Sequence, residues 1–222
     1  MSGPQGKARG RFVVLDGIDG CGKSTQAARL AEALRRGKPG AAPGAETLHL
    51  REPGSTKLGE ALRGLVLERG GDLSPAVEAL LFATARRQML DEVVEPALAR
   101  GAHVVVERFH PSTFAYQGFA GGLGEDAVVE LLERFAGAPR PDRVILLEIE
   151  PEVAARRLAS ARDRRGDRIE DKGLEFQRRV AEGFRRYARR FEATGHVAVV
   201  DASLPEAEVH ERVLAEVLRA VR

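Results

Sequence analysis

The sequence predicts an α/β protein in which a five-stranded parallel sheet is flanked by helices. Short apolar runs of strand length alternate with longer segments of helical periodicity, which is the pattern of parallel strands joined by right-handed helical crossovers. The run at residues 103–106 is almost continuously apolar, as expected of a strand that is buried on both faces. A glycine-rich turn joins the first apolar run to the first helical segment.

The elements follow from this pattern in chain order. Strands are predicted at residues 12–15, 47–50, 103–106, 144–149 and 197–200. Helices are predicted at residues 24–35, 58–67, 75–90, 91–100, 126–135, 151–159 and 174–191, and a last amphipathic helix follows the fifth strand. Residues 37–44 are rich in Gly and Pro and form a loop. This loop is too short to separate domains, so we expect a flexible tail at residues 1–10 and a single domain at residues 11–222.

Several residues mark the ends of these helices. Ser74 and Pro75 are typical of an N-cap and a first helical residue, and Ser203 with Glu206 suggests a capping box before the last helix. Pro96 is expected to interrupt the helix at residues 91–100. The long helix carries one apolar stripe, which predicts a core-facing surface rather than a ligand site. The stripe consists of Phe176, Val180, Phe184, Tyr187 and Phe191.

The composition is that of a globular protein and argues against several other classes. Apolar residues make up 43% of the chain and charged residues 31%, and no run of 18 apolar residues occurs, so no membrane span is expected. A single cysteine rules out an internal disulfide and fits a reducing cytoplasm. The net charge is only +2 and no long basic block occurs. We therefore expect the arginines to bind phosphates of a small substrate and not nucleic acid.

The strongest motif is Gly17-Ile18-Asp19-Gly20-Cys21-Gly22-Lys23-Ser24, which matches the phosphate-binding pattern G-x-x-x-x-G-K-[ST] in full. It lies between a predicted strand and a predicted helix, as the motif requires, so a chance glycine turn is a minor alternative. Backbone N–H groups and the helix N-terminus bind phosphates. Lys23 adds a charge at the β- and γ-phosphates, and the Ser24 hydroxyl can bind Mg²⁺. The predicted ATP-binding residues are Gly17, Asp19, Gly20, Cys21, Gly22, Lys23, Ser24 and Thr25.

A P-loop alone does not separate switches, motors and kinases. The chain contains no asparagine, so the N-K-x-D motif that gives the GTPase switches their guanine specificity is absent. A motor or helicase usually needs a longer chain. The small-molecule kinases remain, and these need additional arginines to hold the acceptor.

Two candidate acceptor positions follow the P-loop in the sequence. Arg51 ends the second predicted strand, and ligands of such sheets bind at the carboxyl ends of the strands. Phe82 and Arg86 are one helical turn apart, so a nucleobase could stack on the ring and bond the guanidinium. A core phenylalanine beside a surface arginine is an equally good interpretation of this pair.

The third strand ends in Glu107, Arg108 and Phe109. The carboxylate suits Mg²⁺ or its waters, and the arginine suits the phosphate that is transferred. Residues 112–118 follow, and their mixed polar and aromatic composition predicts a loop. Tyr116 in this segment could face a ligand or could be half-buried core.

Five segments together resemble the thymidylate kinase family along nearly the whole chain. They are GIDGCGKST at 17–25, REPGSTKLGEALRGLVL at 51–67, LLFATARRQ at 80–88, ERFHPSTFAYQG at 107–118 and DRIE at 167–170. The resemblance implies a P-loop NTPase fold, a homodimer, and transfer of the γ-phosphoryl group of ATP to dTMP, giving dTDP and ADP in pyrimidine deoxynucleotide synthesis.

The resemblance also implies roles for individual residues. Asp19 lies near the 3′-hydroxyl of the acceptor and the metal, and Arg51 and Arg108 hold the dTMP phosphate. Tyr116 crowds the 2′ position of the sugar. Phe82 stacks on thymine, while Arg86 and Gln117 bond its edge. The predicted substrate-binding residues are Asp19, Arg51, Phe82, Arg86, Arg108, Ser112, Tyr116 and Gln117, and the predicted metal ligands are Ser24, Asp19 and Glu107.

Two departures from the family pattern stand out. The family commonly has Asp where Glu107 stands, and residues 118–122 contain fewer glycines than in close relatives. No P-loop position carries an arginine, so the family resemblance places the catalytic arginine in an arginine-rich lid at about residues 160–170. The predicted catalytic residues are Lys23, Arg108, Arg164 and Arg165.

Two other functions remain open from the sequence. A P-loop kinase could act on another nucleoside monophosphate or a small metabolite, and a substrate panel with ATP separates that case. A non-catalytic nucleotide-binding module is disfavoured because Lys23, Ser24 and the arginines are all present.

Overall fold

The computed structural model describes residues 9–38, 40–67, 73–160 and 172–219. Its described residues form a five-stranded parallel sheet with the strand order β2-β3-β1-β4-β5. The strands are β1 Phe12–Asp16, β2 Thr47–Arg51, β3 His103–Glu107, β4 Arg143–Glu148 and β5 Val197–Asp201. The predicted fold class is confirmed, and each predicted strand lies within a residue or two of its observed position.

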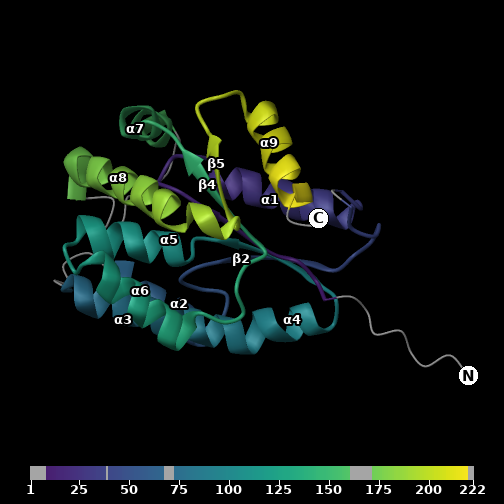
Figure 1. Ribbon diagram of the computed structural model, residues 1–222, viewed down its shortest axis with the longest axis horizontal. Helices are drawn as coiled ribbons and strands as arrows, with labels where there is room; N and C mark the ends of the chain where they lie inside the picture. The colour runs from purple at the N-terminus through teal and green to yellow at the C-terminus, as the bar shows by residue number, and fades with distance from the viewer. Residues whose placement is uncertain (1–8, 39, 68–72, 161–171, 220–222) are drawn as a thin grey trace, which may run out of the picture.

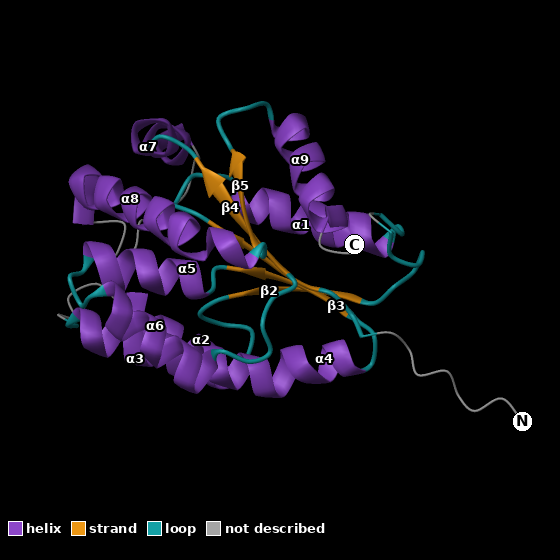
Figure 2. Ribbon diagram, viewed as in Figure 1, coloured by secondary structure: helices purple, strands orange, loops and turns teal. Residues whose placement is uncertain are grey.

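Helices cover both faces of the sheet (Figures 1 and 2). On one side lie α1 Lys23–Arg35 and α9 Glu206–Arg219; α4 Glu95–Ala99 and α8 Gly173–Phe191 cover the other. The remaining α-helices are α2 Lys57–Leu67, α3 Pro75–Met89, α5 His110–Thr113, α6 Glu125–Ala136 and α7 Pro151–Ser160. Two π-helices, η1 Leu90–Val94 and η2 Phe114–Ala120, and one 3₁₀ helix, η4 Glu192–Thr194, complete the described elements.

The central strands are buried on both faces, as their apolar sequences predict. All five residues of β1 are buried, and so are the first four of β3. The register pairs Leu15 with Glu107 and Arg51 with Glu107. Three polar strand ends, Asp16, Arg51 and Glu107, therefore meet at one edge of the sheet.

The segment at residues 112–118 is helical, so the prediction of a loop there was wrong. It lies in α5 and in the π-helix η2. The reason is tertiary packing against the stripe on α8: Phe114 meets Tyr187 at 5.3 Å between ring centroids, and Tyr116 meets Phe184 at 6.2 Å. The local pattern of these residues predicts a loop, but the helical conformation buries their aromatic rings against α8, and this tertiary packing outweighs the local preference. The prediction that the α8 stripe faces the core is confirmed for Val180, Phe184 and Tyr187.

Two other local predictions were refined. The backbone stays helical from the π-helix η1 into α4, and Pro96 lies in the first turn of α4. The wider turn of η1 just before Pro96 accommodates a residue that has no N–H. Arg9 and Gly10, assigned to the tail, contact the body: Arg9 pairs with Asp142 at 2.9 Å, and the Gly10 N–H donates to the Leu98 carbonyl. The other tail residues lie outside the described part of the chain.

One of the two predicted helix caps forms. The Ser74 hydroxyl accepts a hydrogen bond from the Val77 N–H at 3.3 Å, with Pro75 at the start of α3. Ser203 does not cap α9; its N–H and hydroxyl both donate to the Asp201 carboxylate, at 2.8 and 2.6 Å. The prediction of a capping box was therefore wrong, because Ser203 bonds to the Asp201 carboxylate two residues before it and not to the start of α9.

Replacing each serine by alanine should separate the two cases. Ser74→Ala is expected to lower the unfolding free energy by ~1 kcal/mol, the usual loss for an N-cap side chain. Ser203→Ala is the control and should cost clearly less. Urea denaturation of both variants measures the difference, and equal losses would show that the Ser74 hydroxyl is not acting as a cap.

Candidate active site

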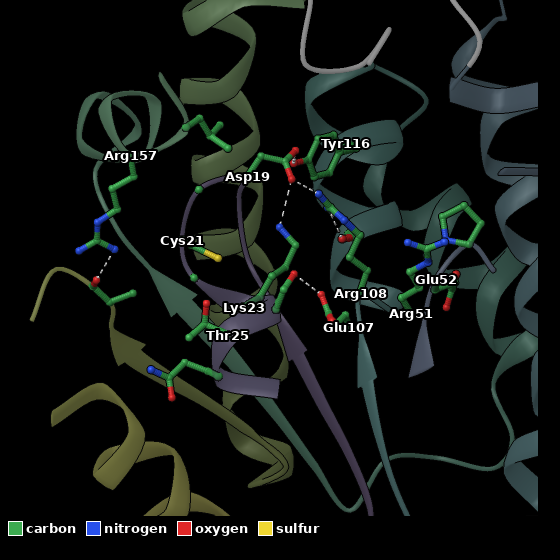
Figure 3. A pocket seen from close by; sticks show the side chains of 18 of the residues that line it. Asp19, Cys21, Lys23, Thr25, Arg51, Glu52, Glu107, Arg108, Tyr116 and Arg157 are labelled. Atoms are coloured by element: carbon green, nitrogen blue, oxygen red, sulfur yellow. Dashed lines mark hydrogen bonds and ion pairs between the residues drawn. The ribbon is translucent and has the colours of Figure 1, made fainter. Parts of the chain in front are cut away.

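A cavity of about 830 Å³ runs along the carboxyl edge of the sheet. The P-loop lies at its centre, and the ends of β2 and β3, helix α3 and the turn η2 line one half (Figure 3). The other half lies between α7 and the segment from Ala202 into α9. The cavity therefore offers room for a ligand on each side of the P-loop.

The P-loop glycines are required by close contacts. Gly17 and Gly20 have φ angles of 147° and 83°, which L side chains rarely adopt. A Cβ at Gly17 would lie 2.6 Å from the Leu147 carbonyl oxygen, and one at Gly20 would lie 2.4 Å from that of Ala154. Cys21 beside them is buried, and burial raises the pKa of its thiol. A buried thiol with a raised pKa is a poor nucleophile.

The buried Asp19 carboxylate gathers three site residues. Its Oδ1 contacts the Lys23 Nζ at 3.1 Å and also accepts from Arg108, while its Oδ2 accepts from the Tyr116 hydroxyl at 3.1 Å (Figure 3). Burial alone would raise the pKa of Asp19, but the cations of Arg108 and Lys23 lower it well below its usual range. Asp19 is thus ionised at neutral pH and holds both cations at the centre of the cavity.

Arg108 adopts a backbone conformation that is unusual for an arginine. Its φ is 65°, in the left-handed region where a residue with a Cβ is strained. The guanidinium donates to the Ser112 hydroxyl at 3.1 Å and lies 5.3 Å from the Tyr116 ring centroid. Burial opposes its charge, but the neighbouring Asp19 raises the pKa of Arg108 well above its ordinary value. The cation is fixed, charged and aimed at the P-loop.

The strand ends are connected by Asp16, which the sequence analysis did not single out. Its side chain is fully buried. Oδ1 accepts from the Gly17 N–H at 2.8 Å and the Ser112 hydroxyl at 2.7 Å, and Oδ2 accepts from the N–H groups of Phe109 and Ser112, both at 3.0 Å. One carboxylate therefore joins the start of the P-loop to the segment that carries Arg108.

Glu107 lies beside the start of α1. The Ser24 hydroxyl donates to its Oε2 at 2.5 Å, and the His49 Nε2 lies 2.7 Å from its Oε1. Burial would raise the pKa of Glu107, but the hydrogen bonds from His49 and Ser24 lower it. Two of the predicted metal ligands, Ser24 and Glu107, therefore meet, while Asp19 is turned toward Lys23 and Arg108. The support from His49 had no signal in the sequence.

At the far end of the cavity Phe82 is half-buried and Arg86 is fully buried. Arg86 makes a two-bond pair with Glu52, at 2.8 and 2.5 Å, and donates to the Thr113 hydroxyl at 2.9 Å. Its Nη1 has no hydrogen-bond partner among the described residues. An orphaned, buried guanidinium N–H is costly in a folded protein, and Arg86 lines the cavity.

The other predicted substrate residues occupy distinct places. Gln117 is buried and its Nε2 donates to Glu78 at 2.8 Å. Arg51 is exposed at the cavity mouth, with its nearest carboxylate oxygen on Glu60 at 3.4 Å. Thr25 follows Ser24 in α1 and is exposed. The arginines of the predicted lid, including Arg164 and Arg165, lie outside the described residues.

The half of the cavity between α7 and α9 contains residues that the sequence analysis missed. The Arg157 side chain lines this half of the cavity and donates to the Ala202 carbonyl at 2.9 Å (Figure 3). Leu204 and Val209 supply apolar surface beside it. These residues come from elements far apart in the sequence, and no local motif marks them.

The thymidylate kinase family model matches residues 15–213 of this sequence. The chain belongs to the thymidylate kinase family. Thymidylate kinases from Synechococcus sp. (strain RCC307) and Bordetella petrii are each 43% identical to it, over 92% and 94% of this chain and 94% and 95% of theirs. The crystal structure of thymidylate kinase from Ehrlichia chaffeensis matches with a TM-score of 0.73 at 26% identity, over 94% of this chain and 99% of that one.

Membership of this family confirms the predicted P-loop NTPase fold and the predicted enzyme class. This thymidylate kinase family member is a nucleoside monophosphate kinase, with ATP as phosphoryl donor and dTMP as acceptor. A kinase of another metabolite and a non-catalytic module are not favoured. No described helix is long and apolar enough to cross a membrane.

The buried pair of Arg86 and Glu52 should be far more sensitive to charge removal than its exposed counterpart. Glu52→Gln is expected to lower the unfolding free energy by about 3–5 kcal/mol, because it leaves the Arg86 cation buried without a counter-ion. Glu60→Gln breaks the exposed pair with Arg51 and should cost less than ~1 kcal/mol. Urea denaturation of both variants is the measurement. Similar small losses would mean that Arg86 is not held by ionic pairing.

Proposed function

We propose that the chain moves the γ-phosphoryl group of ATP directly onto the phosphate of dTMP, with the two nucleotides bound end to end in the 830 Å³ cavity. The observation that carries this proposal is the continuity of the cavity from the Arg157 end, past the P-loop, to Phe82, Arg86 and Gln117. One ligand alone would leave half of these groups unused. The single cysteine and the composition fit an enzyme of the cytoplasm.

The donor nucleotide would place its phosphates on the P-loop. Backbone N–H groups from Gly20 to Thr25 and the N-terminus of α1 supply donors and positive potential there. Lys23 would leave the Asp19 carboxylate for the β- and γ-phosphates. The purine would lie between α7 and α9, against Leu204 and Val209 and beside Arg157.

The acceptor would lie on the other side, with its phosphate toward Lys23. Arg108 and Arg51 would bind that phosphate, and the Ser112 hydroxyl, which accepts from Arg108 at 3.1 Å, would hold Arg108 in place. Thymine would stack on Phe82. The unpartnered Nη1 of Arg86 would donate to its O4 atom, and Gln117 would bond the neighbouring ring position.

The sugar would lie over Asp19 and Tyr116. Asp19 can accept a hydrogen bond from the 3′-hydroxyl, and the Tyr116 ring, held by its own bond to Asp19, would occupy the space that a 2′-hydroxyl needs. This arrangement favours deoxyribose. Tyr116 is buried, and its pKa is raised by burial and then by the Asp19 charge, so its phenol stays protonated.

Magnesium is implied by the reaction, and the residues present fit it. Mg²⁺ in such sites takes one or two protein oxygens together with substrate phosphates and water. Ser24 Oγ and the ionised Glu107 supply two adjacent hard oxygens at the P-loop, and Glu107 is held from behind by His49. When bound, the ion would be held by Ser24 and Glu107 and would supply positive charge that neutralises the charge developing during transfer.

The chemistry asks mainly for alignment and charge. The attacking oxygen of dTMP is already anionic at neutral pH, so no strong general base is needed. Lys23 and Arg108, which both contact the Asp19 carboxylate, would bind the phosphates on either side of the transferred group. Further positive charge at the transition state would come from the arginines of the predicted lid.

A homodimer is also proposed, through the outer surfaces of α2, α3 and α6. These helices pack side by side at one edge of the molecule (Figure 1). They carry five large apolar side chains that are exposed in the single chain, namely Leu58, Leu65, Val77, Leu80 and Phe135. An exposed apolar surface of this kind is typical of a protein–protein interface.

Lys23→Met should abolish most turnover while leaving the fold intact. The variant removes the charge at the transferring phosphate and keeps a side chain of similar length. Steady-state kinetics with ATP and dTMP, together with thermal unfolding, provide the measurement. A folded variant with near-normal kcat would contradict the assigned role of the P-loop lysine.

dTMP should have the highest kcat/KM in a panel that includes dUMP, dCMP, dGMP and AMP. Tyr116→Ala should also narrow the ratio of kcat/KM between dTMP and its ribose analogue, because it removes the ring from the 2′ side. An unchanged ratio would make Tyr116 a structural residue. A better acceptor than dTMP in the wild-type panel would instead point to a different nucleotide kinase.

The lid prediction concerns Arg162, Arg164, Arg165 and Arg168. Alanine at one of these positions should lower kcat much more than it raises KM for dTMP, the pattern of an interaction made mainly in the transition state. An arginine beside the transferring group contributes roughly 10³–10⁵ in kcat. Near-wild-type kcat in all four single variants would assign the charge to Arg108 or to the other subunit.

A further inference from the structure

A buried carboxylate lies directly behind the base end of the cavity. Glu78, in the first turn of α3, has only 1% of its surface exposed. Its Oε2 accepts from the Gln117 Nε2 at 2.8 Å, and its Oε1 lies 3.5 Å from the Lys172 Nζ. Glu78 has no role in the phosphoryl transfer described above. Burying a carboxylate costs free energy unless hydrogen bonds and ion pairs compensate for the lost hydration.

The bond from Gln117 fixes which way its amide faces. An ionised carboxylate only accepts hydrogen bonds, so the NH₂ group of Gln117 is the end that turns toward Glu78. The carbonyl oxygen, Oε1, is then the atom left for a ligand. None of the described residues donates a hydrogen bond to it, and Gln117 lines the cavity.

The base end therefore presents one donor and one acceptor. The donor is the Arg86 Nη1, which has no partner among the described residues, and the acceptor is the Gln117 Oε1. Thymine offers the complementary pair, an O4 acceptor beside an N3–H donor. Cytosine offers the reverse, an amino donor beside an unprotonated N3 acceptor. Its amino group would face the Arg86 donor, and its N3 would face the Gln117 acceptor, so neither hydrogen bond could form.

We infer that Glu78 is a positioning residue that sets the choice of pyrimidine by locking the amide orientation of Gln117. The inference rests on the proposed binding of dTMP at Phe82, Arg86 and Gln117. Lys172 supports it as a cation beside the buried carboxylate, with its ammonium also 4.8 Å from the Phe176 ring centroid. The Lys172 ammonium contacts the Glu78 Oε1 at 3.5 Å, which leaves the Oε2 atom to the Gln117 amide.

Glu78→Gln tests this assignment directly. A glutamine at residue 78 can donate as well as accept, so Gln117 is free to turn either end toward the cavity. The ratio of dTMP to dCMP affinity, measured by calorimetry, should fall by about tenfold or more, the equivalent of one mismatched buried hydrogen bond. The KM for ATP should stay unchanged, because the donor half of the cavity is not touched.

Glu175→Gln is the matched control, since Glu175 is an exposed partner of Arg178 on α8. It should leave the ratio at its wild-type value. A folded Glu78→Gln protein with the wild-type ratio, or with both nucleotides weakened equally, would overturn the inference. The proposed function fails separately, if wild-type protein does not phosphorylate dTMP in the parallel assay.

A second measurement uses wild-type protein in case the variant does not fold. The side-chain NH₂ of Gln117, assigned in a ¹⁵N spectrum by its loss in Gln117→Glu, should be protected from hydrogen exchange both before and after dTMP is added. Protection that disappears when dTMP binds would show that the amide releases Glu78, and would contradict the lock.

Discussion

The site depends first on the buried carboxylate of Asp16. It accepts four hydrogen bonds, one from the P-loop at Gly17 and three from Phe109 and Ser112. These two segments follow different strands, β1 and β3, which are neighbours in the sheet. Arg108 lies between the sheet and this anchored segment, in a left-handed conformation that costs free energy unless its surroundings hold it. The Asp16 carboxylate thus helps to fix the position of Arg108 relative to the phosphate loop, together with the bond from the Arg108 N–H to the Leu15 carbonyl.

Other buried carboxylates also hold polar side chains in position in the rest of the site. Asp19 holds Lys23 and Arg108, Glu52 holds Arg86, and Glu78 holds the Gln117 amide. Under the proposed binding of ATP and dTMP, each of these cations and the amide would be oriented by its carboxylate partner, which would reduce the ordering that binding requires. In the proposed mechanism the Asp19 pairs differ from the other two, because the phosphates of both nucleotides would compete with Asp19 for Lys23 and Arg108. The buried partners of Arg86 and Gln117 can remain in place.

The sequence predicts the fold and the P-loop well, because both depend on local patterns. Apolar runs located the five strands, and Gly17 to Ser24 gave the phosphate loop. Local patterns do not predict the partners of Arg86. The spacing of Arg86 from Phe82 predicted that the two share a helix face, but it did not predict that Arg86 would be buried and bonded to Glu52 and Thr113. The same holds for Asp16, Glu78 and His49, whose roles come from segments that only the folded sheet brings together. Residues 112–118 were assigned to a loop because the rings that pack on Tyr116 and Phe114, those of Phe184 and Tyr187, lie 68 and 73 positions further along the chain.

Replacing Asp16 by asparagine tests the central claim most directly. The amide keeps the shape of the side chain but can accept on one oxygen only, so at least one buried N–H loses its partner at a cost of ~1–3 kcal/mol. Asp201→Asn is the control, because Asp201 also accepts from an N–H and a hydroxyl after a strand but is exposed. The account predicts that Asp16→Asn alone loses unfolding free energy in urea and weakens binding of both ATP and dTMP. Wild-type stability and affinities in Asp16→Asn would contradict it.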